Sequence, residues 1–195
     1  MLKKPSILIL LLAIASILFL SLLFLKSKNS GPIQFPPGPA PAKAFMNTVW
    51  GMSAQEVQEA VQADLTPAEV GTRFYSPKNP AVNESKIKAY EQIGLDFLGR
   101  KATVTYIFYM DRLFIYRVSV RSSDADALDS DVTQHLMGQF GEGFVQEDPK
   151  ASAKIIWQTK DLIVNYWLYQ DDLRLVEKFS AVFAVMYQPL ERLVQ

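Results

Sequence analysis

The chain has 195 residues, no cysteine, and 20 basic residues that balance 20 acidic ones. The lack of cysteine excludes disulfides, thiolate catalysis and cysteine-ligated metal centres. Five of the basic residues precede the first acidic residue, Glu56, so the part from Met46 onward holds 15 basic and 20 acidic residues, a net charge of −5. Because nucleic-acid binding needs clustered lysine and arginine, this balance argues against nucleic acid as a partner.

The first long feature is an uncharged stretch of 19 residues, Ile7 to Leu25, made mostly of Leu, Ile, Ala and Phe. As a helix it would be about 30 Å long, the thickness of a bilayer's hydrocarbon core. It is longer than the roughly 7–15 apolar residues of a cleavable signal peptide. We therefore expect residues 1–29 to be a retained membrane anchor, with Ile7 to Leu25 in the lipid bilayer. The alternative is cleavage at Ala42-Lys43-Ala44.

The charges beside this stretch favour one orientation only slightly. Lys3 and Lys4 precede it, and Lys26 and Lys28 follow it. Under the positive-inside rule this is close to a tie. We favour a cytoplasmic N-terminus, which places the C-terminal domain on the periplasmic side of the inner membrane. The reverse orientation, with a cytoplasmic domain, is the alternative.

Residues 30–45 are rich in proline and hold few apolar side chains, which is typical of an extended, semi-rigid linker. A proline-rich ligand for an SH3-like module is the other interpretation, but the basic flanking residues that give such ligands specificity are missing. Residues 46–195 have the length of one ordinary domain of about 150 residues. We therefore expect an anchor, a linker and one soluble domain.

The domain begins with a strong helix signal. Ser53 and Glu56 have the spacing of a capping box, and Met52 and Val57 have that of a hydrophobic staple. These pairs predict a helix that starts at Ala54.

Two weaker signals follow. Thr66-Pro67-Ala68-Glu69 has proline at a first helical position, and Gly71 leaves room for a single helical turn. Residues 76–85 contain two prolines and two asparagines, which predicts a loop.

From Glu91 the apolar residues alternate with polar ones, which predicts three antiparallel strands in a meander. The predicted turns lie at Gly99-Arg100 and Asp111-Arg112. The alternating positions are Ile93, Leu95 and Phe97, then Val104, Tyr106, Phe108 and Met110, then Phe114, Tyr116, Val118 and Val120. We expect four aromatic residues of these strands to line the core: Tyr106, Phe108, Phe114 and Tyr116.

The second half repeats this order of elements. Residues 123–140 have apolar side chains four apart and acidic residues in the first turn, which predicts a helix. Three strands follow, with predicted turns at Lys160-Asp161 and Asp171-Asp172, and Pro189 starts a short terminal helix. The predicted strands are Lys154 to Gln158, Leu162 to Gln170 and Arg174 to Met186.

A shift of sixty residues superimposes Val104, Tyr106, Tyr109 and Asp111 on Val164, Tyr166, Tyr169 and Asp171. This self-similarity suggests a tandem repeat of residues 46–121 and 122–195. The predicted fold class is α+β, with antiparallel strands in two similar helix-plus-three-strand units. Helices are expected on one face, and a single transmembrane helix is expected before the domain.

The helix start Trp50-Gly51-Met52-Ser53, and a middle strand that runs through Tyr106, Phe108 and Tyr109 into an acidic turn, resemble a known family. They are similar to small envelope modules of the SmpA/OmlA type, the small lipoprotein of the outer-membrane β-barrel assembly machinery. That fold is shared with the β-lactamase inhibitory protein. The resemblance implies this fold and a habit of binding other proteins, and it carries over no functional residue. The chain departs from the lipoprotein by lacking a lipidated cysteine.

Two residue groups are candidates for a reactive or metal-binding site. His135 is the only histidine and has no orienting partner in the pattern, so we expect it on the surface of the second helix. Asp124, Asp126, Asp129 and Asp131 lack the glycine and bidentate glutamate of a calcium loop, and acids at a helix start are expected from its dipole. We predict no catalytic residue, no metal and no cofactor.

Three aromatic residues are the candidates for partner binding: Tyr109, Trp167 and Tyr169. Strand neighbours alternate between faces, so we expect these three opposite the core aromatic residues. An uncovered aromatic patch is typical of a protein-binding surface. The predicted function is therefore a membrane-tethered, non-catalytic envelope domain on the periplasmic side that binds another protein or assists assembly of an envelope complex.

The alternative is a small-molecule sensor that uses the sheet face as its pocket. It predicts a cavity of about 300 Å³ or more with converging polar groups, whereas protein binding predicts a flatter apolar patch. A hydrolase is the least favoured function, because the sequence has no G-x-S-x-G motif and a single histidine.

Overall fold

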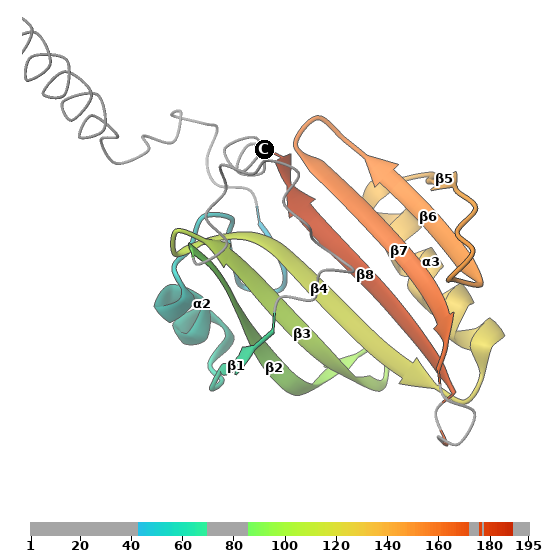
Figure 1. The fold of residues 1–195 in the computed structure, drawn as a ribbon, viewed down its shortest axis with the longest axis horizontal. Helices are drawn as coiled ribbons and strands as arrows, with labels where there is room; N and C mark the ends of the chain where they lie inside the picture. Colours follow the sequence, from blue (N-terminus) through green and yellow to red (C-terminus); the bar gives the residue numbers. More distant parts are fainter. Residues whose placement is uncertain (1–42, 70–85, 172–175, 177, 189–195) are drawn as a thin grey trace, which may run out of the picture. The chain divides into compact units, whose positions relative to one another are not determined.

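The computed structural model describes residues 43–69, 86–171, 176 and 178–188. They form two helices and eight strands (Figure 1). The helices are α2 (Ala54–Val61) and α3 (Ala125–Phe140). The strands are β1 (Thr66–Ala68), β2 (Ile87–Phe97), β3 (Arg100–Tyr109), β4 (Arg112–Ser122), β5 (Phe144–Val145), β6 (Ala153–Gln158), β7 (Leu162–Gln170) and β8 (Phe179–Tyr187).

The eight described strands make one antiparallel sheet in the order β1-β2-β3-β4-β8-β7-β6-β5. In its middle, β4 pairs with β8 from Ile115 opposite Met186 to Ser122 opposite Phe179. The prediction of two helix-plus-three-strand units is therefore wrong, because each half of the chain adds four strands to one continuous sheet. Separate units would leave β4 and β8 with unpaired backbone N–H and C=O groups, and pairing the two strands satisfies both rows.

The residues around Pro67 form strand β1 and not the predicted helical turn. Thr66 pairs with Glu91 and Ala68 pairs with Ala89 on β2. Proline has no N–H to donate to a ladder, so it is tolerated on an edge strand. The helix-start pattern failed here because the open edge of β2 offers the segment a strand partner.

Helix α2 starts at Ala54, as predicted, and its capping box is present. The Ser53 hydroxyl accepts from the Glu56 backbone N–H at 3.3 Å, and the Glu56 carboxylate accepts from the Ser53 backbone N–H at 2.7 Å. Val57 is its buried residue. The cap thus sets the first turn of α2.

Helix α3 confirms the prediction for residues 123–140, with its first helical residue at Ala125. The Asp124 carboxylate caps it by accepting from the Ala127 backbone N–H at 3.1 Å. Three residues one helical turn apart are buried: Leu128, Val132 and Leu136. The acidic start and the apolar spacing together account for this helix.

Both helices bury side chains in one core on the same face of the sheet. Figure 1 shows α3 on the far side of the strands, behind the β6–β7 region. The strand residues of this core alternate along the sheet, and they include Val104, Tyr106, Val118, Tyr166 and Phe183. We call the opposite side of the sheet the second face.

The segment before α2 completes the core. Trp50 stacks between Tyr116 and Tyr187, with ring centroids 5.5 Å away on each side. The backbone N–H of Gly51 donates to the Leu113 carbonyl at 2.9 Å. The Trp-Gly-Met-Ser motif therefore attaches this segment to the β3–β4 hairpin.

The core aromatic residues were predicted correctly with one exception. Tyr106, Phe108 and Tyr116 lie in the core under the helices, but Phe114 packs in a second cluster on the second face. The ladder between β3 and β4 shifts register between Ile107 and Phe108. Such a bulge puts one extra residue into a strand, which breaks the alternation and turns Phe114 to the other side.

Among the described residues, no helix is both long and apolar enough to cross a membrane. The expected anchor at Ile7 to Leu25 lies outside the described residues, as do most of the linker at 30–45 and the terminal helix expected from Pro189. These three remain predictions.

Candidate functional site

Strands β3 and β4 present two polar rows on the second face. Ala102 and Val104 of β3, and Val118 and Val120 of β4, are fully buried under the helices. Because strand neighbours point to opposite faces, the residues between them point to the second face. These residues are Lys101, Thr103 and Thr105 on β3, and Arg117, Ser119 and Arg121 on β4.

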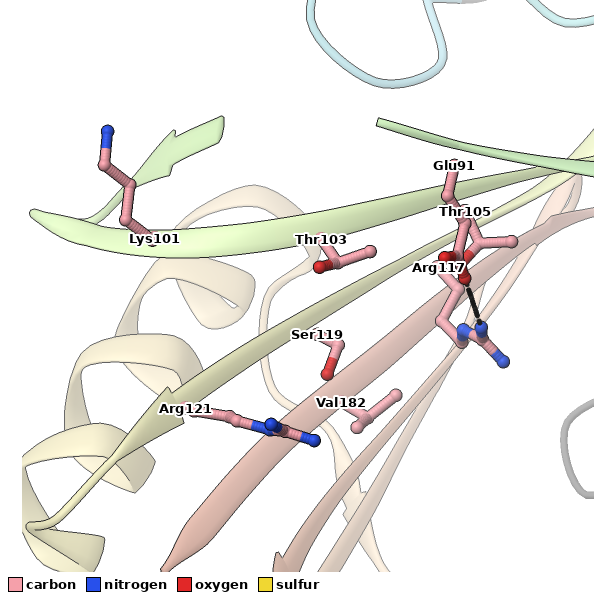
Figure 2. Close-up of a pocket in the computed structure, with 8 residues that line it drawn as sticks. All are labelled: Glu91, Lys101, Thr103, Thr105, Arg117, Ser119, Arg121 and Val182. Atoms are coloured by element: carbon pink, nitrogen blue, oxygen red, sulfur yellow. Dashed lines mark hydrogen bonds and ion pairs between the residues drawn. The ribbon is translucent and has the colours of Figure 1, made fainter. Parts of the chain in front are cut away.

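The two rows line a groove of about 380 Å³, which Figure 2 shows from the second face. We call it the polar groove. Its lining comes from four neighbouring strands and consists of Glu91, Lys101, Thr103, Thr105, Arg117, Ser119, Arg121 and Val182. The lining therefore places three cations, one carboxylate and three hydroxyls along one part of the sheet.

One end of the polar groove is a hydrogen-bonded network. Arg117 Nη2 donates to Thr105 Oγ1 at 2.8 Å, and Thr105 Oγ1 donates to Glu91 Oε1 at 3.1 Å. Arg117 Nη2 also lies 3.5 Å from Glu91 Oε1. Burial lowers the pKa of Arg117, and the charge of Glu91 opposes that shift. Since guanidinium stays protonated in proteins, Arg117 is a cation whose position these contacts hold.

The other end is more exposed. Arg121 Nε lies 3.8 Å from Asp171 Oδ2, and that carboxylate also accepts from the Ser180 hydroxyl. Lys101 Nζ lies 2.8 Å from Asp96 Oδ1, and both side chains are mostly exposed. An exposed pair of this kind contributes little, about 0–1 kcal/mol.

Thr103 and Ser119 form the floor between these ends. They lie opposite each other in the β3–β4 register. In the part of the chain that the structure describes, neither hydroxyl takes part in a hydrogen bond. Guanidinium, ammonium and hydroxyl groups all donate hydrogen bonds, so the groove presents mainly donors to a ligand.

The three aromatic residues predicted for partner binding lie on the second face, in two places along the sheet. Trp167 and Tyr169 are alternate residues of β7, and they pair with Val182 and Ser180 of β8, beside the polar groove. Tyr109 lies at the turn between β3 and β4, with β4 and β8 between it and β7. All three pack in or against the apolar cluster of the second face. Trp167 is only 9% exposed, and Tyr109 and Tyr169 are half-buried.

The apolar half of each strand alternation predicts the core and gives no sign of the polar groove. The signal was present in the segments Lys101–Thr105 and Arg117–Arg121, where every second residue is polar. Ordinary solvent-facing strands show the same pattern. The groove forms because β3 pairs with β2 and β4 pairs with β8, which adds lining residues from both neighbouring strands.

The histidine and the aspartates considered as reactive or metal-binding residues make contacts within the fold. His135 lies on α3, where its ring meets Phe97 edge-on at 5.1 Å, and burial lowers its pKa. Asp129 accepts a hydrogen bond of 2.6 Å from the Tyr166 hydroxyl. Asp131 pairs with Arg100 at 2.7 Å. The described residues contain no group of three or more His, Asp or Glu side chains arranged to hold a metal ion.

Comparison of the chain with known protein families, with characterised proteins and with solved structures finds no match. The resemblance to SmpA/OmlA-type modules therefore stays a prediction.

Proposed function

We propose that this chain is a membrane-tethered, non-catalytic envelope domain that binds a small molecule in the polar groove. The observation that carries the proposal is the groove itself, with a volume of about 380 Å³ and charged and hydroxyl groups that converge on it. Ligand sites typically measure about 300–1,000 Å³. Val182 is the one apolar residue of the lining, so the groove suits a polar ligand.

The membrane part of the proposal rests on the sequence. Ile7 to Leu25 has the length and composition of a bilayer span, and the proline-rich residues 30–45 suit a spacer at about 3 Å per residue. Such a spacer would hold the domain some tens of Å from the bilayer. A periplasmic position follows from the favoured orientation of the anchor.

The non-catalytic part rests on the residue types near the groove. A hydroxyl nucleophile needs an adjacent base to remove its proton. The chain's one histidine, His135, lies on α3 on the other side of the sheet. The carboxylate in the groove, Glu91, is already engaged by Thr105 and Arg117. This arrangement supports binding by hydrogen bonds and charge.

The test is to fill the groove and look for loss of a bound molecule. The full-length chain is purified in mild detergent from its own membrane, and native mass spectrometry measures any retained small molecule. We expect Ser119→Trp to abolish retention, because its ring would occupy the groove. Ser130→Trp, the same change at an exposed position on α3, should retain the molecule. Equal retention by both variants would refute the groove as the binding site.

Protein binding is the second candidate, and the outer strand β5 favours it. Phe144 is 74% exposed and Val145 is 82% exposed. β5 is the last strand of the described sheet, so its outer backbone edge can accept a further strand from a partner. Crosslinking in the native membrane, followed by mass spectrometry, should then give a partner peptide attached near β5. Loss of that crosslink in Phe144→Lys, with retention in Met137→Lys, would support this function.

A further inference from the structure

We infer that the ligand of the polar groove carries an anionic group, a carboxylate or a phosphate, bound by Arg121 together with the hydroxyls of Thr103 and Ser119. This inference rests on the function proposed above and names the chemical class of the ligand. It starts from the hydrogen-bond donors of the groove. The lining has three cations and three hydroxyls against one carboxylate. Each cation also has an acidic neighbour, which is Asp96 for Lys101, Glu91 for Arg117 and Asp171 for Arg121.

Arg121 has binding capacity left. A guanidinium has five N–H donors. In the described part of the chain, the contact of Arg121 is the one between Nε and Asp171, at 3.8 Å, which is too long for a hydrogen bond. The Arg121 side chain is 57% exposed, and Figure 2 shows its guanidinium reaching along the groove toward Val182. Its terminal nitrogens can therefore bind a planar or tetrahedral anion through two hydrogen bonds.

The hydroxyls beside Arg121 add donors at matching positions. Ser119 is two residues from Arg121 on β4, and Thr103 lies opposite Ser119 on β3. Figure 2 shows Ser119 between Arg121 and Arg117, with Thr103 on the neighbouring strand. A carboxylate or phosphate seated over Ser119 would accept from these hydroxyls and from the guanidinium at the same time.

The test measures the affinity of the full-length chain in detergent for two anions, inorganic phosphate and citrate, by NMR titration of the arginine side-chain N–H signals. Sorbitol serves as the uncharged probe. We expect at least one anion to bind saturably and to shift the Arg121 signal, and sorbitol to have no effect. The anion that binds more tightly distinguishes a phosphate ligand from a carboxylate ligand.

Arg121→Gln should weaken that binding at least about tenfold, because it removes a charged hydrogen-bond donor. Lys160→Gln makes the same change of charge in the exposed turn between β6 and β7, and it should leave the affinity unchanged. Arg121→Lys should give an intermediate loss, since it keeps the charge without the two-pronged geometry. Equal affinities in Arg121→Gln and Lys160→Gln, or no saturable binding of either anion, would overturn the inference.

These outcomes separate the inference from the proposed function. If Ser119→Trp removes a co-purified molecule while neither anion binds, the groove has a ligand of another class, and only the inference fails. If Ser119→Trp retains that molecule, the proposed site fails whatever the anions do.

Discussion

Tyr166 on β7 donates a hydrogen bond of 2.6 Å to the carboxylate of Asp129 on α3. Tyr166 is fully buried, and Asp129 lies in the first turns of the helix. This bond ties the sheet to the helix that covers its second half. Asp129 therefore has a structural role in the contact between helix and sheet.

Tyr166→Phe should lower the free energy of unfolding by about 1–2 kcal/mol, because the Asp129 carboxylate loses its hydroxyl donor. Urea unfolding of the full-length chain in detergent measures the change. Tyr90→Phe is the matched control, since the structure shows an aromatic contact for Tyr90 with Phe108 and no hydrogen bond from its hydroxyl in the described part. Equal effects of the two substitutions would show that the Tyr166 bond adds no stability.

High pH should destabilise the fold through its buried tyrosines. Burial raises the pKa of Tyr106, Tyr116 and Tyr166. An unfolded tyrosine loses its proton near pH 10, whereas a buried one with a raised pKa keeps it. The contribution of these tyrosines to the free energy of unfolding is therefore fully present below pH 10 and is lost as pH rises above it. Unfolding free energy measured between pH 8 and pH 11 should fall above pH 10. A flat profile there would contradict the prediction.

Gly143→Ala should destabilise the region around β5 and β6. A Cβ on Gly143 would lie 2.5 Å from Ile155 Cγ2 and 2.6 Å from Trp157 Cε2. Overpacking of this kind costs about 1–3 kcal/mol. The control is Gly138→Ala on α3, where a Cβ meets nothing within 4 Å and alanine favours the helix by up to about 1 kcal/mol. Thermal unfolding should therefore give midpoint shifts of opposite sign, and shifts of equal sign would refute the packing argument.

Ser53→Ala should raise the pKa of Glu56. Hydrogen bonds from the Ser53 backbone and side chain lower that pKa, the backbone bond most strongly. Because the pKa of Glu56 is lower in the folded state, its ionised carboxylate stabilises the fold at pH values above the pKa of the unfolded chain. That contribution is lost as pH falls through the pKa of the folded state. NMR titration of the Glu56 carboxyl measures the shift, and Ser53→Thr should keep the low value. An unchanged pKa in Ser53→Ala would show that the hydroxyl is not involved.

Deletion of residues 1–29 should release the protein from the membrane. Burial of a 19-residue apolar span is the expected basis of its attachment. The measurement is the distribution of the chain between membrane pellet and supernatant after an alkaline carbonate wash. Recovery of the intact chain in the supernatant would contradict the anchor.

Local features of the fold were predictable from neighbouring residues. The cap at Ser53 is a contact between residues three apart. The apolar spacing of Leu128, Val132 and Leu136 and the alternation in β3 and β4 follow the geometry of a single helix or strand with one buried face. Such geometry gives a periodic pattern in the sequence, which is why both helices and the six longer strands were predictable.

Features that depend on distant partners were not predictable. Thr66–Ala68 has a helix-start pattern, and it is a strand because β2 offers it an edge. Phe114 faces the second side of the sheet because of a bulge, which the regular alternation around it conceals. The candidate site was missed for the same reason, since Thr103 and Ser119 resemble ordinary surface residues until their strands pair.

The amino-acid sequence alone determined the local elements, the lack of thiol chemistry and the expectation of an apolar anchor at Ile7 to Leu25, because composition and short-range periodicity are properties of the chain itself. The tertiary structure alone decided that β4 joins β8 in one sheet and that Arg117 and Arg121 face a common groove. Both outcomes depend on hydrogen bonds between residues far apart in the chain. No local sequence pattern predicts which strand will pair with which sheet edge.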